Sequence, residues 1–202
     1  MKRAFVAPLM VLAALLAASA AEAQLELYVA TQKGEREGRG SIVVYQVTGL
    51  GNLTNLTILR TLAKPLNDPN PDMTGLATPS AVAVIQDKLF VANQTGGTSK
   101  TGSITVYDRT ARGNTEPDVT LEGPELDLPS GLAVTETELF VANRSVSQPD
   151  GNRAPSITVY RWSLDSQGKV VFNPPTPVRS IDRKSTRLNS SHSAKSRMPS
   201  SA

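Results

Sequence analysis

The feature that most constrains this chain is an internal repeat of short apolar segments. One segment occurs three times, at Leu27–Ala30, Leu89–Asn93 and Leu139–Asn143. A second also occurs three times, at Ser41–Tyr45, Ser103–Tyr107 and Ser156–Tyr160. A third begins with Pro-Ser, at Pro79–Val84 and Pro129–Val134. A fourth ends each unit, at Ile58–Leu62, Val119–Leu121 and Val178–Ile181. Most of the chain is therefore built from three similar units.

The composition of the repeated segments predicts β-strands. They are rich in Val, Ile, Phe, Tyr and Thr, and clusters of Gly, Pro, Asn and Asp separate them. Beyond residue 23 no stretch sustains an apolar period of 3.6 residues, so almost no helix is expected. Four strands in a unit of about 40–50 residues are typical of a propeller blade. The predicted fold is all-β: a β-propeller of which about three four-stranded blades are present, of a larger propeller with six to eight blades.

The first 23 residues have the features of a secretory signal peptide. Lys2 and Arg3 precede an apolar run over Ala4–Ala18, and an Ala-Glu-Ala site ends at Ala23. The run is short for a membrane span, which takes about 20 residues. We therefore expect cleavage before Gln24, no membrane span after it, and a secreted or periplasmic protein of bacterial type. An uncleaved anchor is the alternative.

Residues 182–202 are expected to be a non-native, disordered tail. The sequence from Asp182 to His192, DRKSTRLNSSH, resembles the translation of a short-read sequencing adapter, and SRMPSSA at the end of the chain resembles the far end of the same adapter.

The predicted leader and the predicted tail also change the net charge, which is +3 for the whole chain. Removing them takes away seven basic and two acidic residues, leaving 14 basic and 16 acidic residues and a net charge of −2. A nucleic-acid partner is therefore not expected, because it needs a basic face.

The repeated unit resembles the NHL-type repeat of bacterial exported β-propellers, and its L-F-V-A-N segment is similar to the YVTN repeat of lactonase-like propellers. The resemblance covers nearly all of residues 25–181, within the predicted repeat domain of residues 24–181. It implies a propeller of six to eight blades, and hence that this chain is a C-terminally truncated fragment. The first unit is expected to lack its innermost strand, because the mature chain begins close to Leu25.

Candidate functional residues lie where exposed loops gather on one face of such a fold. The loops between second and third strands are expected at Thr31–Gly40, Gln94–Gly102 and Arg144–Pro155. The candidate ligand-binding residues there are Arg36, Lys100, Arg144 and Asp150. Loops between units add the acidic residues Asp68, Asp72, Glu122, Glu125 and Asp127.

Other polar residues are assigned structural or solvated positions. Asn93 and Asn143 end matching strands, and a short amide there is expected to cap the following turn. Asp108 and Arg109 are expected on a solvated turn, and the single Trp162 is expected to pack in the core or at an edge. The acidic residues show no recognised calcium-binding spacing, so no metal site or cofactor is identified.

Two classes of function remain open. The first is a non-catalytic binding or scaffold module with an unidentified protein or carbohydrate ligand. It is favoured because the chain has no Cys and one His, which lies in the tail, so a Cys nucleophile and a Ser-His-Asp triad are excluded. The alternative is a lactonase- or lyase-type enzyme that uses Ca²⁺ or Mg²⁺, with its active-site residues mostly in further blades.

Overall fold

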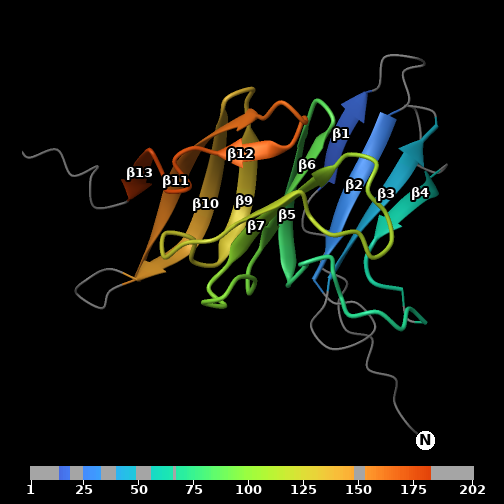
Figure 1. The fold of residues 1–202 in the computed structure, drawn as a ribbon, viewed down its shortest axis with the longest axis horizontal. Coiled ribbons are helices and arrows are strands. Elements are labelled where there is room, and N and C mark those ends of the chain that lie inside the picture. Colours follow the sequence, from blue (N-terminus) through green and yellow to red (C-terminus); the bar gives the residue numbers. More distant parts are fainter. Residues whose placement is uncertain are drawn as a thin grey trace, which may run out of the picture.

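The chain forms three antiparallel β-sheets that lie side by side (Figure 1). This computed structural model describes residues 14–18, 25–32, 40–48, 56–65, 67–147 and 153–182. Within these ranges all helical or strand structure is β-strand, so the predicted all-β class is confirmed for this part of the chain. The finer assignment to a propeller stays a prediction. Most of the predicted leader and residues 183–202 of the predicted tail lie outside the described residues.

The first sheet has four strands in the order β1-β2-β3-β4. They are β1 (Ala14–Ala18), β2 (Leu25–Thr31), β3 (Ser41–Val47) and β4 (Leu56–Leu62). β1, from the predicted leader, pairs antiparallel with β2 and occupies the innermost position in the full chain, and the expectation that the mature chain lacks this strand stays a prediction. A strand edge carries unpaired backbone groups, and the Ala-Leu run satisfies them on β2.

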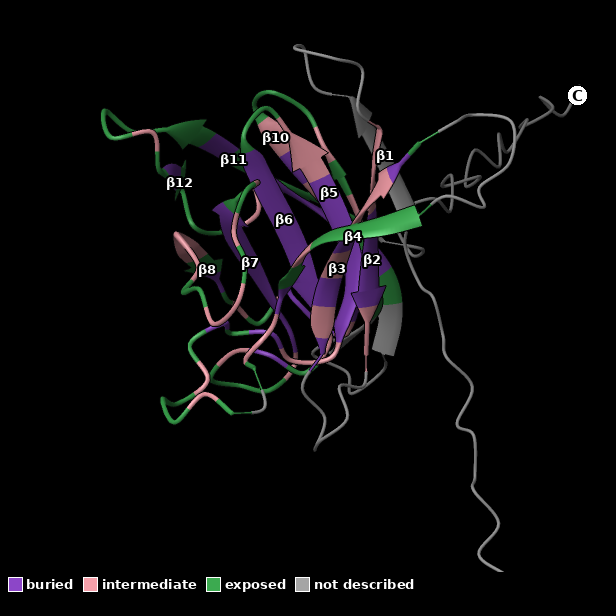
Figure 2. Cartoon of the chain, turned by 90° about the vertical axis from the view of Figure 1, so that its right-hand side faces the viewer, coloured by how far each residue is buried: buried purple, intermediate pink, exposed green. Residues whose placement is uncertain are grey.

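The middle sheet matches the predicted strands. It has the order β5-β6-β7-β8, and its strands are β5 (Pro79–Ile85), β6 (Lys88–Asn93), β7 (Ser103–Asp108) and β8 (Val119–Leu121). Every residue of β6 is buried, as expected for a strand covered on both faces. Figure 2 shows this concentration of buried positions on β6 and β7.

The third sheet is larger than the sequence predicts. Its strands are β9 (Pro129–Val134), β10 (Glu138–Ser147), β11 (Arg153–Leu164), β12 (Val170–Phe172) and β13 (Arg179–Asp182). β10 and β11 extend into the expected Arg144–Pro155 loop, where they pair again after a register shift. The unpredicted β12 pairs with the far end of β11, and β13 pairs with the middle of β11.

Residues at equivalent positions of the repeat pair with each other in all three sheets, so the sequence repeat is also a repeat of the structure. The second, third and fourth strands align Ala30–Ile42–Leu62 in the first sheet, Ala92–Ile104–Leu121 in the middle sheet and Ala142–Ile157–Ile181 in the third. Because side chains alternate between the faces of a strand, each such row projects to one face of its sheet.

The two faces of each sheet have different roles. We call one the forward face; in the middle sheet it carries Phe90, Ala92, Ile104 and Val106. We call the other the rear face; in the middle sheet it carries Leu89, Val91 and Tyr107. The forward face of the first sheet (Tyr28, Ala30, Ile42, Val44) packs on the rear face of the middle sheet. The forward face of the middle sheet packs on the rear face of the third (Leu139, Val141, Tyr160). Full burial of one such large side chain stabilises the fold by about 1.5–3 kcal/mol.

Trp162 completes the second of these cores. It is almost fully buried, its ring lies edge-on to Phe90 with centroids 5.3 Å apart, and its indole N–H donates to the Thr135 carbonyl oxygen at 2.9 Å. The core packing expected for this residue is what the structure shows.

Candidate functional site

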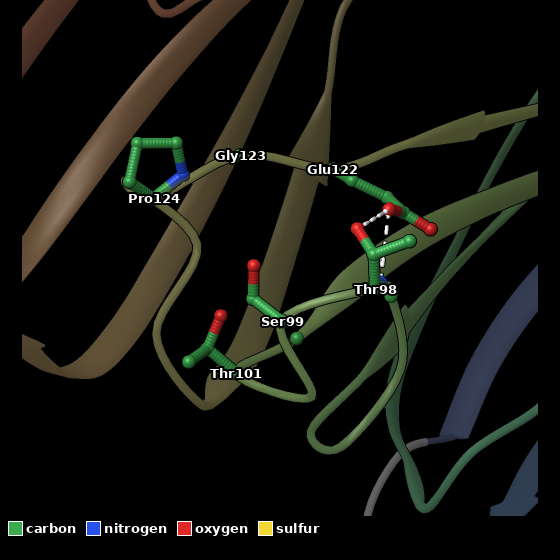
Figure 3. A pocket seen from close by; sticks show the side chains of 8 residues that line it. Thr98, Ser99, Thr101, Glu122, Gly123 and Pro124 are labelled. Atoms are coloured by element: carbon green, nitrogen blue, oxygen red, sulfur yellow. Dashed lines mark hydrogen bonds between the residues drawn. The ribbon is translucent and has the colours of Figure 1, made fainter.

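The candidate binding site is a polar pocket formed by two loops. One is the β6–β7 loop of the middle sheet, and the other is the segment that follows β8 (Figure 3). Its lining residues are Gly97, Thr98, Ser99, Thr101, Gly102, Glu122, Gly123 and Pro124. The cavity volume is about 220 Å³. Pockets for drug-sized ligands span about 300–1,000 Å³, so this one accepts only a small group.

Backbone turns give the β6–β7 loop its shape. The Lys100 N–H donates to the Gly97 carbonyl oxygen, and the Gly102 N–H donates to that of Gly96, both at 3.1 Å. Gly97 has a φ of +84°, in the left-handed region that glycine adopts without a steric cost. The loop therefore folds back on itself and presents its hydroxyl side chains toward the segment after β8.

Glu122 joins the two loops. Its carboxylate accepts hydrogen bonds from the Thr98 N–H at 3.0 Å and from the Thr98 hydroxyl at 2.8 Å. It is the one ionisable side chain among the lining residues, so the pocket offers hydroxyl groups and one carboxylate, and the Thr98 hydroxyl already donates to that carboxylate. This chemistry suits binding of a neutral polar group through hydrogen bonds.

Two of the four predicted ligand-binding residues lie near this pocket. Lys100 is exposed and stands in the pocket-forming loop, between the lining residues Ser99 and Thr101. Arg144 is exposed and lies within β10, where the pairing with β11 shifts register. The Leu128 N–H donates to the Thr101 carbonyl oxygen at 2.7 Å, and the Arg144 N–H donates to that of Leu128 at 3.3 Å. Backbone hydrogen bonds through Leu128 therefore connect the pocket-forming loop with this part of β10.

The other two predicted residues, Arg36 and Asp150, lie outside the described residues. Among the acidic residues predicted for the loops between units, Asp127 differs from expectation, because it is buried rather than solvated. Its backbone N–H donates to the Asn143 side-chain oxygen at 3.3 Å. The sequence gives no sign of this, since the equivalent position in the preceding unit is Ala77.

Asn93 and Asn143 make the same set of contacts in their two sheets. The Asn93 side-chain oxygen accepts from the Ala77 N–H at 3.0 Å, and its amide donates to the Thr105 hydroxyl at 3.0 Å. Asn143 accepts from Asp127 N–H and donates to the Thr158 hydroxyl at 3.1 Å. Both residues are buried and anchor the segment that enters the innermost strand. These bonds run to the segment before the innermost strand and to the third strand, so the expected cap of the following turn is not what the structure shows, and a structural role for both residues stays a prediction.

Sequence analysis missed a cluster of charges between the first and middle sheets. The Glu26 carboxylate forms ion pairs with Arg60 and Arg109, each at 2.9 Å, and the Tyr28 hydroxyl donates to the same carboxylate. The expectation that Arg109 lies on a solvated turn is therefore wrong. One signal in the sequence could have found this cluster. Arg109 lies two residues after Tyr107, and Trp162 lies two residues after the equivalent Tyr160, so the two residues hold equivalent positions.

The cluster sets the ionisation of Glu26. Burial raises the pKa of this carboxyl, but hydrogen bonds from Arg60, Tyr28 and Arg109 and the charge of Arg60 outweigh it and lower the pKa from 4.5 to about 2. The carboxylate is thus held ionised and occupied by protein groups, which indicates a structural pair rather than a free ligand for a cation.

Several comparisons bear on the identity of the site. Among the described residues, no group of three or more His, Cys, Asp or Glu side chains is close enough to hold a metal ion. Within the same residues there is no helix long and apolar enough to cross a membrane. A scan against protein-family models and searches of curated proteins and of solved structures each found no match.

Proposed function

We propose that this chain is an exported repeat protein of the NHL-like propeller type that acts as a non-catalytic binding module. The three sheets represent successive blades. This is supported by the matched residue rows in all three sheets and by the contacts of β5 with both β1 and β9, which bring successive inner strands together. In a propeller the innermost strands surround the central axis.

The observation that carries the binding function is the pocket between the β6–β7 loop and the segment after β8. It lies at the loop edge expected to bind ligands, and it is lined by the hydroxyls of Thr98, Ser99 and Thr101 and the carboxylate of Glu122. The hydroxyls both donate and accept hydrogen bonds and the carboxylate accepts them, as binding of a sugar hydroxyl requires. Since the cavity volume is about 220 Å³, we propose that one unit of a neutral carbohydrate inserts there.

The test is binding of the full chain to an array of neutral and acidic oligosaccharides. Thr98→Val removes one hydroxyl from the pocket, and Thr110→Val removes one from an exposed turn outside it. Loss of one hydrogen bond of about 1–1.5 kcal/mol predicts binding that is roughly tenfold weaker for the first variant and unchanged for the second. Equal loss in both variants, or a wild-type chain that binds peptides and no glycan, would replace this ligand assignment.

The alternative enzyme is tested on the same preparation. Titration with Ca²⁺ and Mg²⁺ by calorimetry, followed by turnover of a simple lactone in the presence of the metal, distinguishes the classes. Saturable metal binding with metal-dependent lactone hydrolysis would overturn the binding-module proposal.

A further inference from the structure

The two sheet contacts inside the chain obey one rule: a forward face packs on a rear face. At the first contact, the Tyr28 hydroxyl of the first sheet accepts a hydrogen bond from Arg109 of the middle sheet at 3.0 Å. At the second, Phe90, which is equivalent to Tyr28, meets Trp162, which is equivalent to Arg109. The rule therefore specifies what kind of surface a third contact needs.

The forward face of the third sheet packs on no other sheet among the described residues, and its apolar residues are exposed or half-buried except for Val159, which is buried. Ile157 is 41% exposed and Ile181 is 48% exposed, whereas their counterparts Ile104 and Leu121 are 0% and 3% exposed. Ala133 is exposed as well, while its counterpart Ala83 is buried. This face also carries Phe140, half-buried with the Arg179 guanidinium 5.8 Å from its ring centroid. An apolar face of this kind marks an interaction surface.

The first sheet has the complementary rear face. Leu27 and Tyr45 occupy the positions that Leu89 and Tyr107 hold in the middle sheet, and both are only half-buried. Ile58 pairs with Tyr45 on this face and is 59% exposed. Val29 and Val47, also on this face, are already covered within the chain, so the part near Ile58 is the open part.

Pro155 determines which kind of inner strand can lie next to the third sheet. At its two equivalent positions, Gly40 and Gly102, an added Cβ would lie 2.0 Å from Pro79 Cδ and 2.3 Å from Pro129 Cδ, respectively. A glycine therefore makes room for the proline that begins the next inner strand. With Pro155 there is no such room, so an inner strand of the same Pro-Ser type does not fit.

The first sheet avoids this conflict. The chain has no proline between Pro8 and Pro65, so no Pro-Ser strand precedes β2. Charges also fit: Glu138 on the forward face of the third sheet is neutralised within its own sheet by Arg179 at 2.8 Å. In the first sheet Val47 stands where the middle sheet has Arg109, so no uncompensated charge is buried at the contact.

We propose that the forward face of the third sheet binds the rear face of the first sheet of a second copy of this chain. The contact is head-to-tail: each copy offers both faces, so assembly continues until a ring closes or a filament forms. Ile157 and Ile181 of one copy and Ile58 of the other form its apolar centre. Since no ion pair crosses the contact, assembly is insensitive to salt between about 0.05 and 0.5 M NaCl.

The experiment compares the masses of full-chain variants by sedimentation velocity. Wild type is expected to form oligomers whose size rises with concentration. Ile157→Asp removes the third-sheet face, and Ile58→Asp removes the first-sheet face, so each alone is a monomer. Leu164→Asp changes a residue of similar exposure, 43%, that does not lie on either face, and it is expected to assemble as wild type does.

Mixing the two monomeric variants gives the decisive result. Ile157→Asp keeps its first-sheet face and Ile58→Asp keeps its third-sheet face, so the mixture forms a 1:1 dimer that grows no further. Circular dichroism confirms that each variant folds. A monomeric wild type, single variants that still assemble or precipitate as wild type does, or a mixture that stays monomeric would each overturn the proposal. Loss of binding to oligosaccharides with intact assembly would affect the proposed function alone.

Discussion

Replacing Glu26 with Gln should lower the free energy of unfolding by about 3 kcal/mol near pH 7. The pKa of this carboxyl falls from 4.5 to about 2 on folding. Each pKa unit corresponds to about 1.4 kcal/mol of preference for the ionised form, so 2.5 units give about 3 kcal/mol. Only 14% of the Glu26 side chain is exposed, so solvent screening takes little from this value.

The same pKa change fixes the dependence on pH. Because the folded-state pKa is the lower one, the stabilisation is complete above the unfolded value of 4.5 and is lost as the pH falls toward 2. Near pH 3 about 1.4 kcal/mol remains, so the difference between wild type and Glu26→Gln should shrink by about 2 kcal/mol from its value near pH 7.

Urea unfolding of the full chain, followed by far-UV circular dichroism at both pH values, measures this difference. Glu136→Gln is the control, because Glu136 is exposed, and a surface change of this kind alters stability by about 0.5 kcal/mol or less. A loss below about 1 kcal/mol for Glu26→Gln near pH 7, or a loss that is the same at both pH values, would refute the assigned role of the cluster.

Three further predictions concern other parts of the chain. Asn93→Ala removes the acceptor of the part-buried Ala77 N–H and the donor to the buried Thr105 hydroxyl and should cost about 2 kcal/mol in urea unfolding, whereas an unchanged midpoint would contradict its structural role. Gly102→Ala places a Cβ 2.3 Å from Pro129 and should lower the free energy of unfolding by about 2 kcal/mol or more. Gly113→Ala has nothing within 4 Å of the added Cβ and should lower it by about 1 kcal/mol, because of its positive φ alone. Equal losses in the two variants would argue against the close contact at Gly102. Mass spectrometry of the chain exported by a bacterial host should find Gln24 at the N-terminus, and retention of residues 1–23 would refute the predicted leader.

The strands were predictable because their signals are local and repeated. The segments from Leu89 to Asn93 and from Ser103 to Tyr107 carry strand composition in themselves, and their recurrence fixes the unit. β12 lacked such a signal, because Val170–Phe172 has no counterpart in the repeated unit and forms only against the extended end of β11.

β1 was missed for a different reason. An Ala-Leu run matches an export signal at least as well as a strand, and only the open edge of β2 determines that residues 14–18 pair there. Pairing of this kind depends on a distant partner, so propensity within the run does not reveal it.

The sequence predicts where the candidate site lies but not which residues line it. The repeat locates the loop edge, and the pocket lies there, but its lining depends on Glu122 reaching Thr98 across 24 residues of sequence. The Glu26–Arg109 pair joins positions 83 residues apart. A single sequence shows that both residues are charged and does not show that they meet.

The position of Trp162 has a consequence for how unfolding can be observed. As the one tryptophan of the chain, it reports through Phe90 on the contact between the middle and third sheets, whereas Glu26 lies at the contact between the first and middle sheets. In stacked repeats, stability is approximately a sum of unit and neighbour terms, so the two contacts need not melt together. Fluorescence and circular dichroism curves of Glu26→Gln that separate would measure how weakly neighbouring sheets are coupled, and curves that coincide would show that damage at one contact is transmitted across the whole middle sheet.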